Sequence, residues 1–79
     1  MPEINVLQIK AARSLLNWKQ PDLAKAAGVG VATVKRFETG ATPIPVVRAA
    51  IVTALEKAGV IFESDGKYVG VKLKIKRGK

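Results

Sequence analysis

Lysine and arginine are the side chains of this sequence with the clearest chemical use. The 79 residues contain 14 of them against 6 aspartates and glutamates, a formal net charge of +8, and they contain neither histidine nor cysteine. The six carboxylates are scattered and show no pairing suited to acid–base catalysis or metal binding. We therefore expect a protein that is not an enzyme, with no catalytic residue, metal site, cofactor or small-molecule substrate.

The positive charge favours a polyanion as the partner. Cations that neutralise phosphates release condensed counterions, which strengthens binding to nucleic acid whatever its sequence. The plainer alternative is that the charge only keeps a small protein in solution.

One small domain must carry these charges. A chain of 79 residues is near the size at which folding buries roughly 60% of the unfolded chain's surface. Because no disulfide can form, stability must come from an apolar core, from a partner subunit, or from both. No run approaches the roughly 18 apolar residues of a membrane span, and the first residues, MPEINVLQIK, lack a signal-peptide pattern. We expect a cytoplasmic protein without a membrane partner.

Four helices are predicted by apolar spacing and by stop signals. They cover residues 4–16, 20–27, 31–38 and 46–58. In the first, the stripe expected to be buried consists of Ile4, Leu7, Ala11 and Leu15, widened by Ala12, Leu16 and Trp18. Pro21 suits the first turn of the second helix, and Gly28 ends it.

After residue 59 the apolar period changes from helical to alternating, which predicts a β-hairpin. Placing Asp65 and Gly66 at a tight turn puts Phe62 opposite Val69. In this register the second strand outruns the first.

The longer second strand would leave Leu73 and Ile75 with no strand of their own chain beside them. The expected fold is mainly α: a four-helix bundle over residues 1–59, followed in the same domain by a β-hairpin and basic tail over residues 60–79.

Residues 20–39 fit two short helices that cross around a tight turn. Such packing needs small or apolar residues on the inner faces, a glycine at the turn and an apolar plug in its corner. The sequence supplies these as Leu23, Ala24, Ala27, Gly28, Val29, Val34 and Phe37.

This motif resembles the helix-turn-helix of the Cro and lambda-repressor type of regulators, often called XRE-like. The likeness spans residues 7–58 and rests on IKAARSLLNWKQPDLAKAAGVGVATVKRFETG, with a proline-bearing loop and an amphipathic helix after it. It implies a lambda-repressor-like bundle that lays residues 31–38 in the major groove of double-stranded DNA. The DNA contacts that it implies are Lys19, Gln20, Val31, Ala32, Thr33, Lys35, Arg36, Thr39 and Thr42.

Among these, the resemblance places Val31, Ala32 and Arg36 at base edges. The apolar pair would pack on thymine methyl groups, and Arg36 would reach O6 and N7 of a guanine. Lys19 stands where the family usually has a capping Ser or Thr, which removes the cap but adds a cation beside the expected phosphate.

The other residues would lie along the backbone of the DNA. Gln20 would contact a phosphate or an outer base, Thr33 and Lys35 would lie near phosphates, and Thr39 and Thr42 would follow the sugar-phosphate strand. Plainer alternatives stay open: the basic side chains could be solvated charges, and the apolar pair could be buried against a neighbouring subunit or loop.

The strand overhang predicts a homodimer. Val71, Leu73 and Ile75 would pair with the same strand of a second subunit, and recognition helices about 34 Å apart would match palindromic half-sites one turn of DNA apart. The alternative is an edge strand whose lysines discourage pairing.

These expectations add up to a sequence-specific DNA-binding transcriptional regulator, acting as a dimeric repressor. Two alternatives remain: an antitoxin that binds its own operator and a toxin, and a small basic RNA-binding protein.

Overall fold

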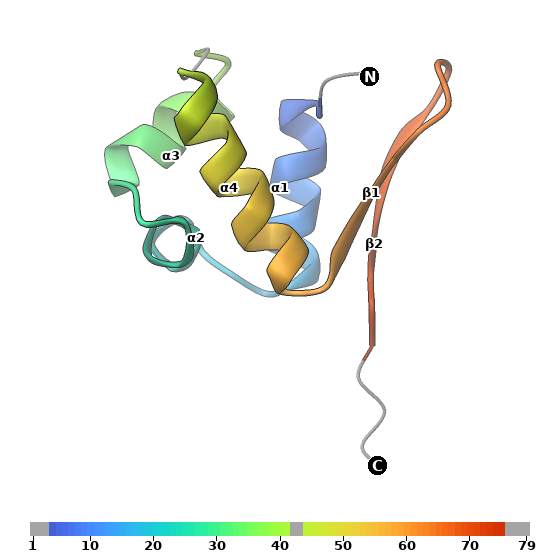
Figure 1. Cartoon of the computed structure of the whole chain (residues 1–79), viewed down its shortest axis with the longest axis horizontal. Helices are drawn as coiled ribbons and strands as arrows, with labels where there is room; N and C mark the ends of the chain where they lie inside the picture. The colour runs from blue at the N-terminus through green and yellow to red at the C-terminus, as the bar shows by residue number, and fades with distance from the viewer. Residues whose placement is uncertain (1–3, 42–43, 76–79) are drawn as a thin grey trace.

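Four helices and one antiparallel hairpin form the fold, as predicted (Figure 1). The computed structural model describes residues 4–41 and 44–75. The elements are α1 (Val6–Leu15), α2 (Gln20–Ala27), α3 (Val31–Glu38), α4 (Pro45–Lys57), β1 (Val60–Ser64) and β2 (Val69–Leu73). The bounds of α2 and α3 are those predicted, α4 lies one residue earlier, and α1 is shorter at both ends. No helix in the described ranges is long and apolar enough to cross a membrane.

Asn5 sets the start of α1. Its side-chain oxygen accepts a hydrogen bond from the backbone N–H of Leu7 at 2.7 Å, and its own N–H donates to Oε1 of Gln8 at 2.8 Å. Both N–H groups would otherwise lack a partner at the helix end. The helix therefore begins at Val6, two residues later than apolar spacing predicts.

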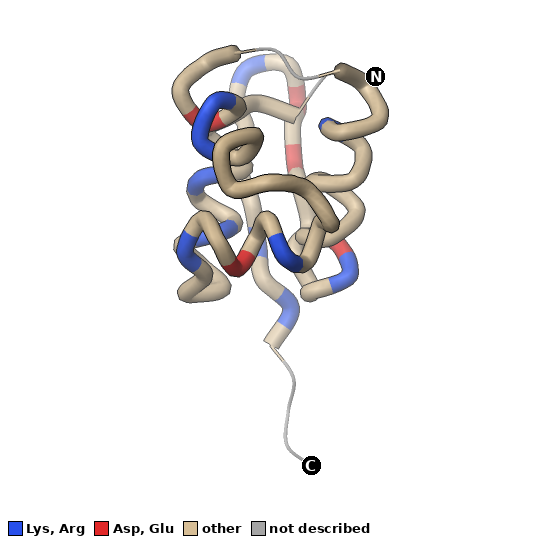
Figure 2. Tube along the Cα trace, turned by 90° about the vertical axis from the view of Figure 1, so that its left-hand side faces the viewer, with Lys and Arg blue, Asp and Glu red and all other residues tan. Residues whose placement is uncertain are grey.

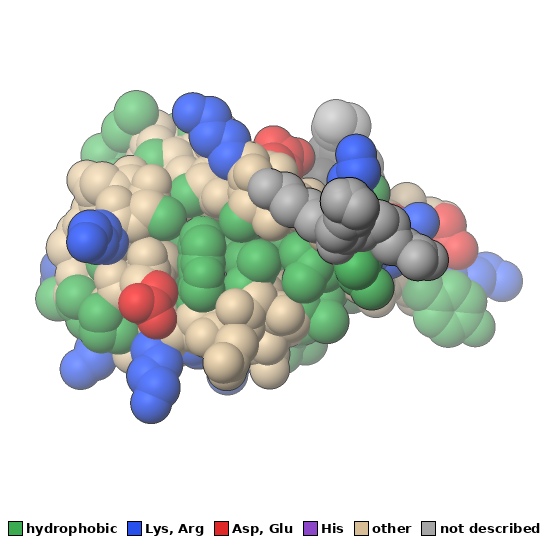
Figure 3. All heavy atoms as spheres, turned by 90° about the horizontal axis from the view of Figure 1, so that it is seen from below, with side chains coloured by type: hydrophobic (Ala, Val, Ile, Leu, Met, Phe, Trp, Pro, Cys, Tyr) green, Lys and Arg blue, Asp and Glu red, His purple; other side chains and the backbone are tan. Residues whose placement is uncertain are grey.

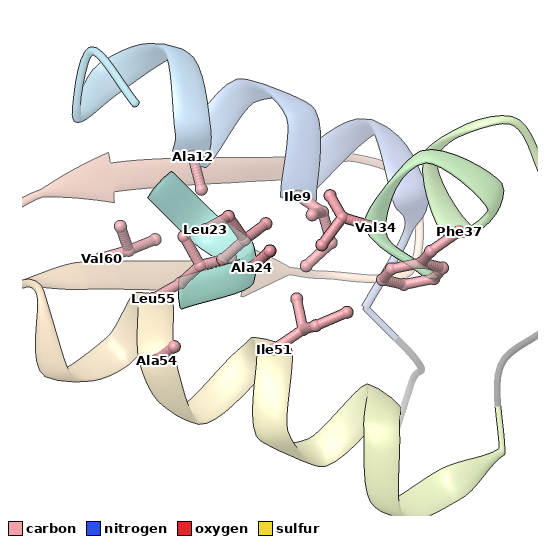
Figure 4. Packing of buried hydrophobic residues seen from close by; sticks show 10 residues of the cluster. All are labelled: Ile9, Ala12, Leu23, Ala24, Val34, Phe37, Ile51, Ala54, Leu55 and Val60. Carbon is pink, nitrogen blue, oxygen red and sulfur yellow. The ribbon is translucent and has the colours of Figure 1, made fainter. Parts of the chain in front are cut away.

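The core lies between the helices and reaches the base of the hairpin (Figure 4). In that view α1 and β2 lie on one side of it and α4 on the other, with β1 nearer to α4. The buried apolar residues are Ile9, Ala12, Leu23, Ala24, Val34, Phe37, Ile51, Ala54, Leu55 and Val60. Because Val60 belongs to β1, the bundle and the hairpin share this core.

Half of the predicted buried stripe of α1 is wrong: Ala12 is buried, and Ile4, Leu16 and Trp18 pack partly buried against the core, but the other three residues are exposed. Leu7 is 63% and Leu15 46% exposed, and Ala11 between them is exposed as well. Ile9, which the prediction left out, is buried together with Ala12 on another side of the helix.

Gln8 explains this rotation of α1. Its side-chain Nε2 donates to the carbonyl oxygens of Glu63 at 3.0 Å and Gly70 at 2.9 Å, while its Oε1 accepts from Asn5. A buried amide is stable when its polar atoms have partners, so this glutamine lies inside and fastens α1 to both strands.

The predicted hairpin register is wrong by two residues. Val60 pairs with Leu73, and Phe62 pairs with Val71 rather than with Val69. The same side chains still share one face, because a shift of two keeps the alternation. β2 therefore does not outrun β1 within the described residues, and Leu73 has a partner in its own chain.

The turn explains the shift. Its centre is Gly66 and Lys67, with Gly66 at φ 92°. The N–H of Asp65 donates to the carbonyl of Tyr68 at 3.1 Å, and the Asp65 carboxylate accepts from the N–H groups of Lys67 at 3.0 Å and Tyr68 at 2.8 Å. These bonds need Asp65 beside the turn, not inside it, and they lower the pKa of its carboxyl group.

Candidate nucleic-acid interface

The turn between α2 and α3 has the geometry that the motif requires. Gly28 has φ 72°, a left-handed conformation that favours glycine. The N–H of Val29 then donates to the carbonyl of Ala24 at 3.0 Å, and the Val29 side chain packs against the core. The helix-turn-helix predicted for residues 20–39 is thus present.

One face of α3 is free of the chain's own core. Ala32, Lys35, Arg36 and Thr39 are all exposed, and their spacing of three or four residues places them on one side of the helix. Within the described residues no other part of the chain buries these side chains. The helix therefore presents a short row in which a small apolar residue is followed by two cations.

Val31 and Thr33 differ from that row. Both are half-buried, and Val31 packs against the core. Only part of the Val31 side chain is left to meet a base, whereas Ala32 beside it is exposed. Thr42 lies outside the described residues.

The start of α2 lies beside α3. Lys19 makes no side-chain cap, as predicted, and its backbone N–H instead donates to the Asp22 carboxylate at 2.8 Å. The amide of Gln20 is half-buried, and its Nε2 donates to Oε1 of Glu38 at 3.0 Å. Gln20 is therefore tied to the far end of α3.

A buried ion pair also joins α1 to α3. Arg13 donates from Nε to Oε2 of Glu38 at 2.7 Å and from its terminal nitrogens to Oε1 of Glu38 at 2.8 Å and to the Trp18 carbonyl at 3.0 Å. Two parallel bonds of this kind fix direction as well as distance. The Glu38 carboxylate thus links α3 to α1 through Arg13 and to α2 through Gln20.

The environment of Glu38 keeps it ionised. Burial alone raises the pKa of this carboxyl, but the hydrogen bonds from Arg13 and Gln20 and the charge of Arg13 outweigh burial, so the pKa lies below its usual 4.5. Sequence reasoning assigned no role to Glu38 or Arg13. The signal available for Glu38 was its position four residues after Val34, on the buried face of α3.

The α2–α3 side is basic (Figure 2). Lys19, Lys25, Lys35 and Arg36 are exposed, and within the described ranges none of them forms an ion pair. Seen from below, basic side chains stand out at the rim of the molecule and hydrophobic ones fill its middle (Figure 3). Such cations are available to a polyanion.

Comparison with protein families agrees with this geometry. Residues 9–55, more than half of the chain, match the family model described as Helix-turn-helix. No curated protein matches the chain. The match includes most of α1, both helices of the motif and most of α4.

Proposed function

Since the chain belongs to the Helix-turn-helix family, of the Cro and lambda-repressor type, whose members are DNA-binding transcriptional regulators, we propose that it reads one duplex sequence and represses transcription by occupying it. The observation that carries this proposal is the exposed row of α3, where Ala32, Lys35 and Arg36 stand clear of the core. The family is one of regulatory DNA-binding domains, not of enzymes.

In this proposal α3 lies in the major groove. Arg36 donates two hydrogen bonds to O6 and N7 of a guanine, and Ala32, with the exposed part of Val31, packs on thymine methyl groups. The contacts with thymine methyl groups and the arginine–guanine bonds together allow α3 to distinguish base pairs, although the helix begins with apolar residues.

Phosphates hold the helix in register. We assign this role to Lys19, Gln20, Thr33, Lys35, Thr39 and Thr42. The Gln20 amide has two N–H groups, so one remains for a phosphate after the other has bonded Glu38. Gln20 thereby links the DNA backbone to the end of α3.

We further propose a homodimer that binds palindromic half-sites and blocks access of polymerase. Residues 1–59 then form the DNA-binding part and residues 60–79 the dimerisation element of the same domain, with Val71, Leu73 and Ile75 at the subunit contact. Ile75 supports this assignment because it is 77% exposed.

The test compares Arg36→Ala with Lys35→Ala on two duplexes, a site selected from a random pool and a scrambled one. Arg36→Ala should weaken the selected site by about 1–3 kcal/mol, roughly 5- to 150-fold, and barely affect the scrambled duplex. Lys35→Ala should weaken both about equally, since a phosphate contact carries no sequence information. Fluorescence anisotropy titrations measure both.

An equal loss on the two duplexes for Arg36→Ala would mean that this arginine reads no base. Titration with a structured RNA at the same salt completes the test. RNA binding as tight as that of the selected duplex would overturn a DNA-specific regulator in favour of a basic RNA-binding protein.

A further inference from the structure

An apolar row on α1 faces outward in the single chain. Leu7, Ala11 and Leu15 are four residues apart and so share one side of the helix. Leu7 is 63% and Leu15 46% exposed, although helical spacing makes this row a natural core face. A row of this kind indicates a surface that a partner covers.

Among the described residues, no strand pairs with the outer edge of β2. In antiparallel pairing, residues alternate between pointing their N–H and C=O toward the neighbouring strand and away from it. The carbonyl of Tyr68 and the N–H of Lys74 both bond toward β1. Val69, Val71 and Leu73 therefore point their backbone groups away from β1.

The apolar row and the open edge are neighbours. α1 packs on β2, whereas α4 packs on β1. In Figure 4, α1 and β2 accordingly lie on the side away from α4. Because Ile9 and Ala12 of α1 face the core, the row of Leu7, Ala11 and Leu15 points away from α4, as the outer edge of β2 does.

We propose that a second copy of this chain covers both features at once, with β2 pairing antiparallel to β2 and the two α1 rows meeting across the two-fold axis. The inference rests on the dimer of the proposed function and names its contact surface. A two-fold axis brings the same patch of each copy together. An open strand edge beside an apolar helix row is complementary to itself in that way, since strand meets strand and row meets row.

Charge selects the register of this pairing. Centring it on Val71 overlaps all five residues of each β2 and places Lys72 opposite Gly70 of the second copy. An added Cβ at Gly70 would meet nothing within 4 Å, so the lysine has room there. Glu63 pairs with Gly70 on its other side, and its carboxylate binds Lys72 of its own chain at 3.0 Å, so the incoming lysine would share that carboxylate. Centring on Lys72 would set two lysines directly opposite each other, which is unfavourable.

The first experiment changes the row without touching the core. Leu7→Lys and Leu15→Lys should each convert a sedimenting dimer into a monomer, while the monomer stays folded because both side chains are exposed. Val46→Lys is the matched control: Val46 is 69% exposed on α4 and should leave the dimer unchanged. Dimers in both α1 variants, or a monomeric wild type throughout the concentration range, would overturn the proposal.

The second experiment tests the register and uses the absence of cysteine from the chain. Val71→Cys should give a disulfide-linked dimer under oxidation, because the two Cα atoms of such a pair lie about 5.5 Å apart, within the range of a disulfide. Leu73→Cys should not, since the two copies would lie about 13 Å apart along the strands. Cross-linking of Leu73→Cys and not of Val71→Cys would overturn the register.

DNA reading is tested separately on a duplex with one half-site. If Arg36→Ala loses discrimination there while the wild type sediments as a monomer, the contact surface proposed for the dimer is wrong and the DNA-reading role stands. If Leu7→Lys is monomeric but Arg36→Ala discriminates as well as wild type, the subunit contact stands and base reading by Arg36 fails.

Discussion

Glu38 is the residue of α3 that joins this helix to α1 and α2. Its carboxylate accepts from Arg13 of α1 at 2.7 and 2.8 Å and from Gln20 of α2 at 3.0 Å. Because the folded pKa is below the usual 4.5, the ionised group stabilises the fold above that pH, and this stabilisation is lost as the pH falls through the folded pKa. Glu38→Gln should lower the free energy of unfolding at neutral pH by about 2–3 kcal/mol, since Arg13 loses its charged partner.

Urea unfolding at neutral pH and at about pH 3 measures both effects. The wild type should lose more stability between these pH values than Glu38→Gln does. Glu56→Gln is the matched control: Glu56 is exposed on α4 and forms no ion pair within the described residues, so removing its charge should cost about 0–1 kcal/mol. Equal behaviour of the two variants would contradict the bracing role of Glu38.

At the scale of the elements, the hairpin offers two glycines for comparison. Gly66 has φ 92°, whereas Gly70 in β2 is not in the left-handed region. A Cβ at either position would meet nothing within 4 Å, so only backbone conformation separates them. Gly66→Ala should destabilise the fold by about 1–2 kcal/mol, while Gly70→Ala should leave it unchanged or slightly more stable. Thermal unfolding measures both, and equal losses would argue against a turn centred on Gly66 and Lys67.

The same elements separate what the sequence predicts well from what it does not. The bounds of α2 and α3 follow from local signals, since Pro21 suits a helix start and Gly28 a helix end. The exposed face of α3 follows from the spacing of Val34 and Phe37. These signals lie within a few residues of the feature that they determine.

The errors arise where distant residues decide. Gln8 is buried because carbonyls of Glu63 and Gly70, far along the chain, accept its N–H groups, and this rotates the apolar row of α1 outward. Likewise, Arg13 and Glu38 are 25 residues apart, so no local pattern pairs them. The error in the hairpin register has a local cause. The Asp65 carboxylate accepts hydrogen bonds from backbone N–H groups of the turn, and turn propensities alone do not include such bonds.

At the scale of the whole molecule, two surfaces matter for the proposals: the exposed row of α3 and the outer edge of β2. They lie on different sides of the chain, α3 to the left and the hairpin to the right in Figure 1. A subunit contact through β2 and α1 therefore leaves the exposed row of α3 uncovered in both copies. This arrangement supports a dimer that can bind DNA with both recognition helices.

The spacing of the half-sites tests that arrangement. The chain measures 38 Å in its longest dimension, so two copies can span half-sites about 34 Å apart, one turn of the duplex. Inserting about 5 base pairs between the half-sites turns one of them to the opposite face of the DNA, and the affinity should fall to that of a single half-site. Anisotropy titrations with the selected palindrome, the lengthened site and a lone half-site measure this. Leu7→Lys, if monomeric, should bind all three with nearly the same affinity, because one copy does not sense the spacing. A wild type equally indifferent to the insertion would show that its two copies bind independently.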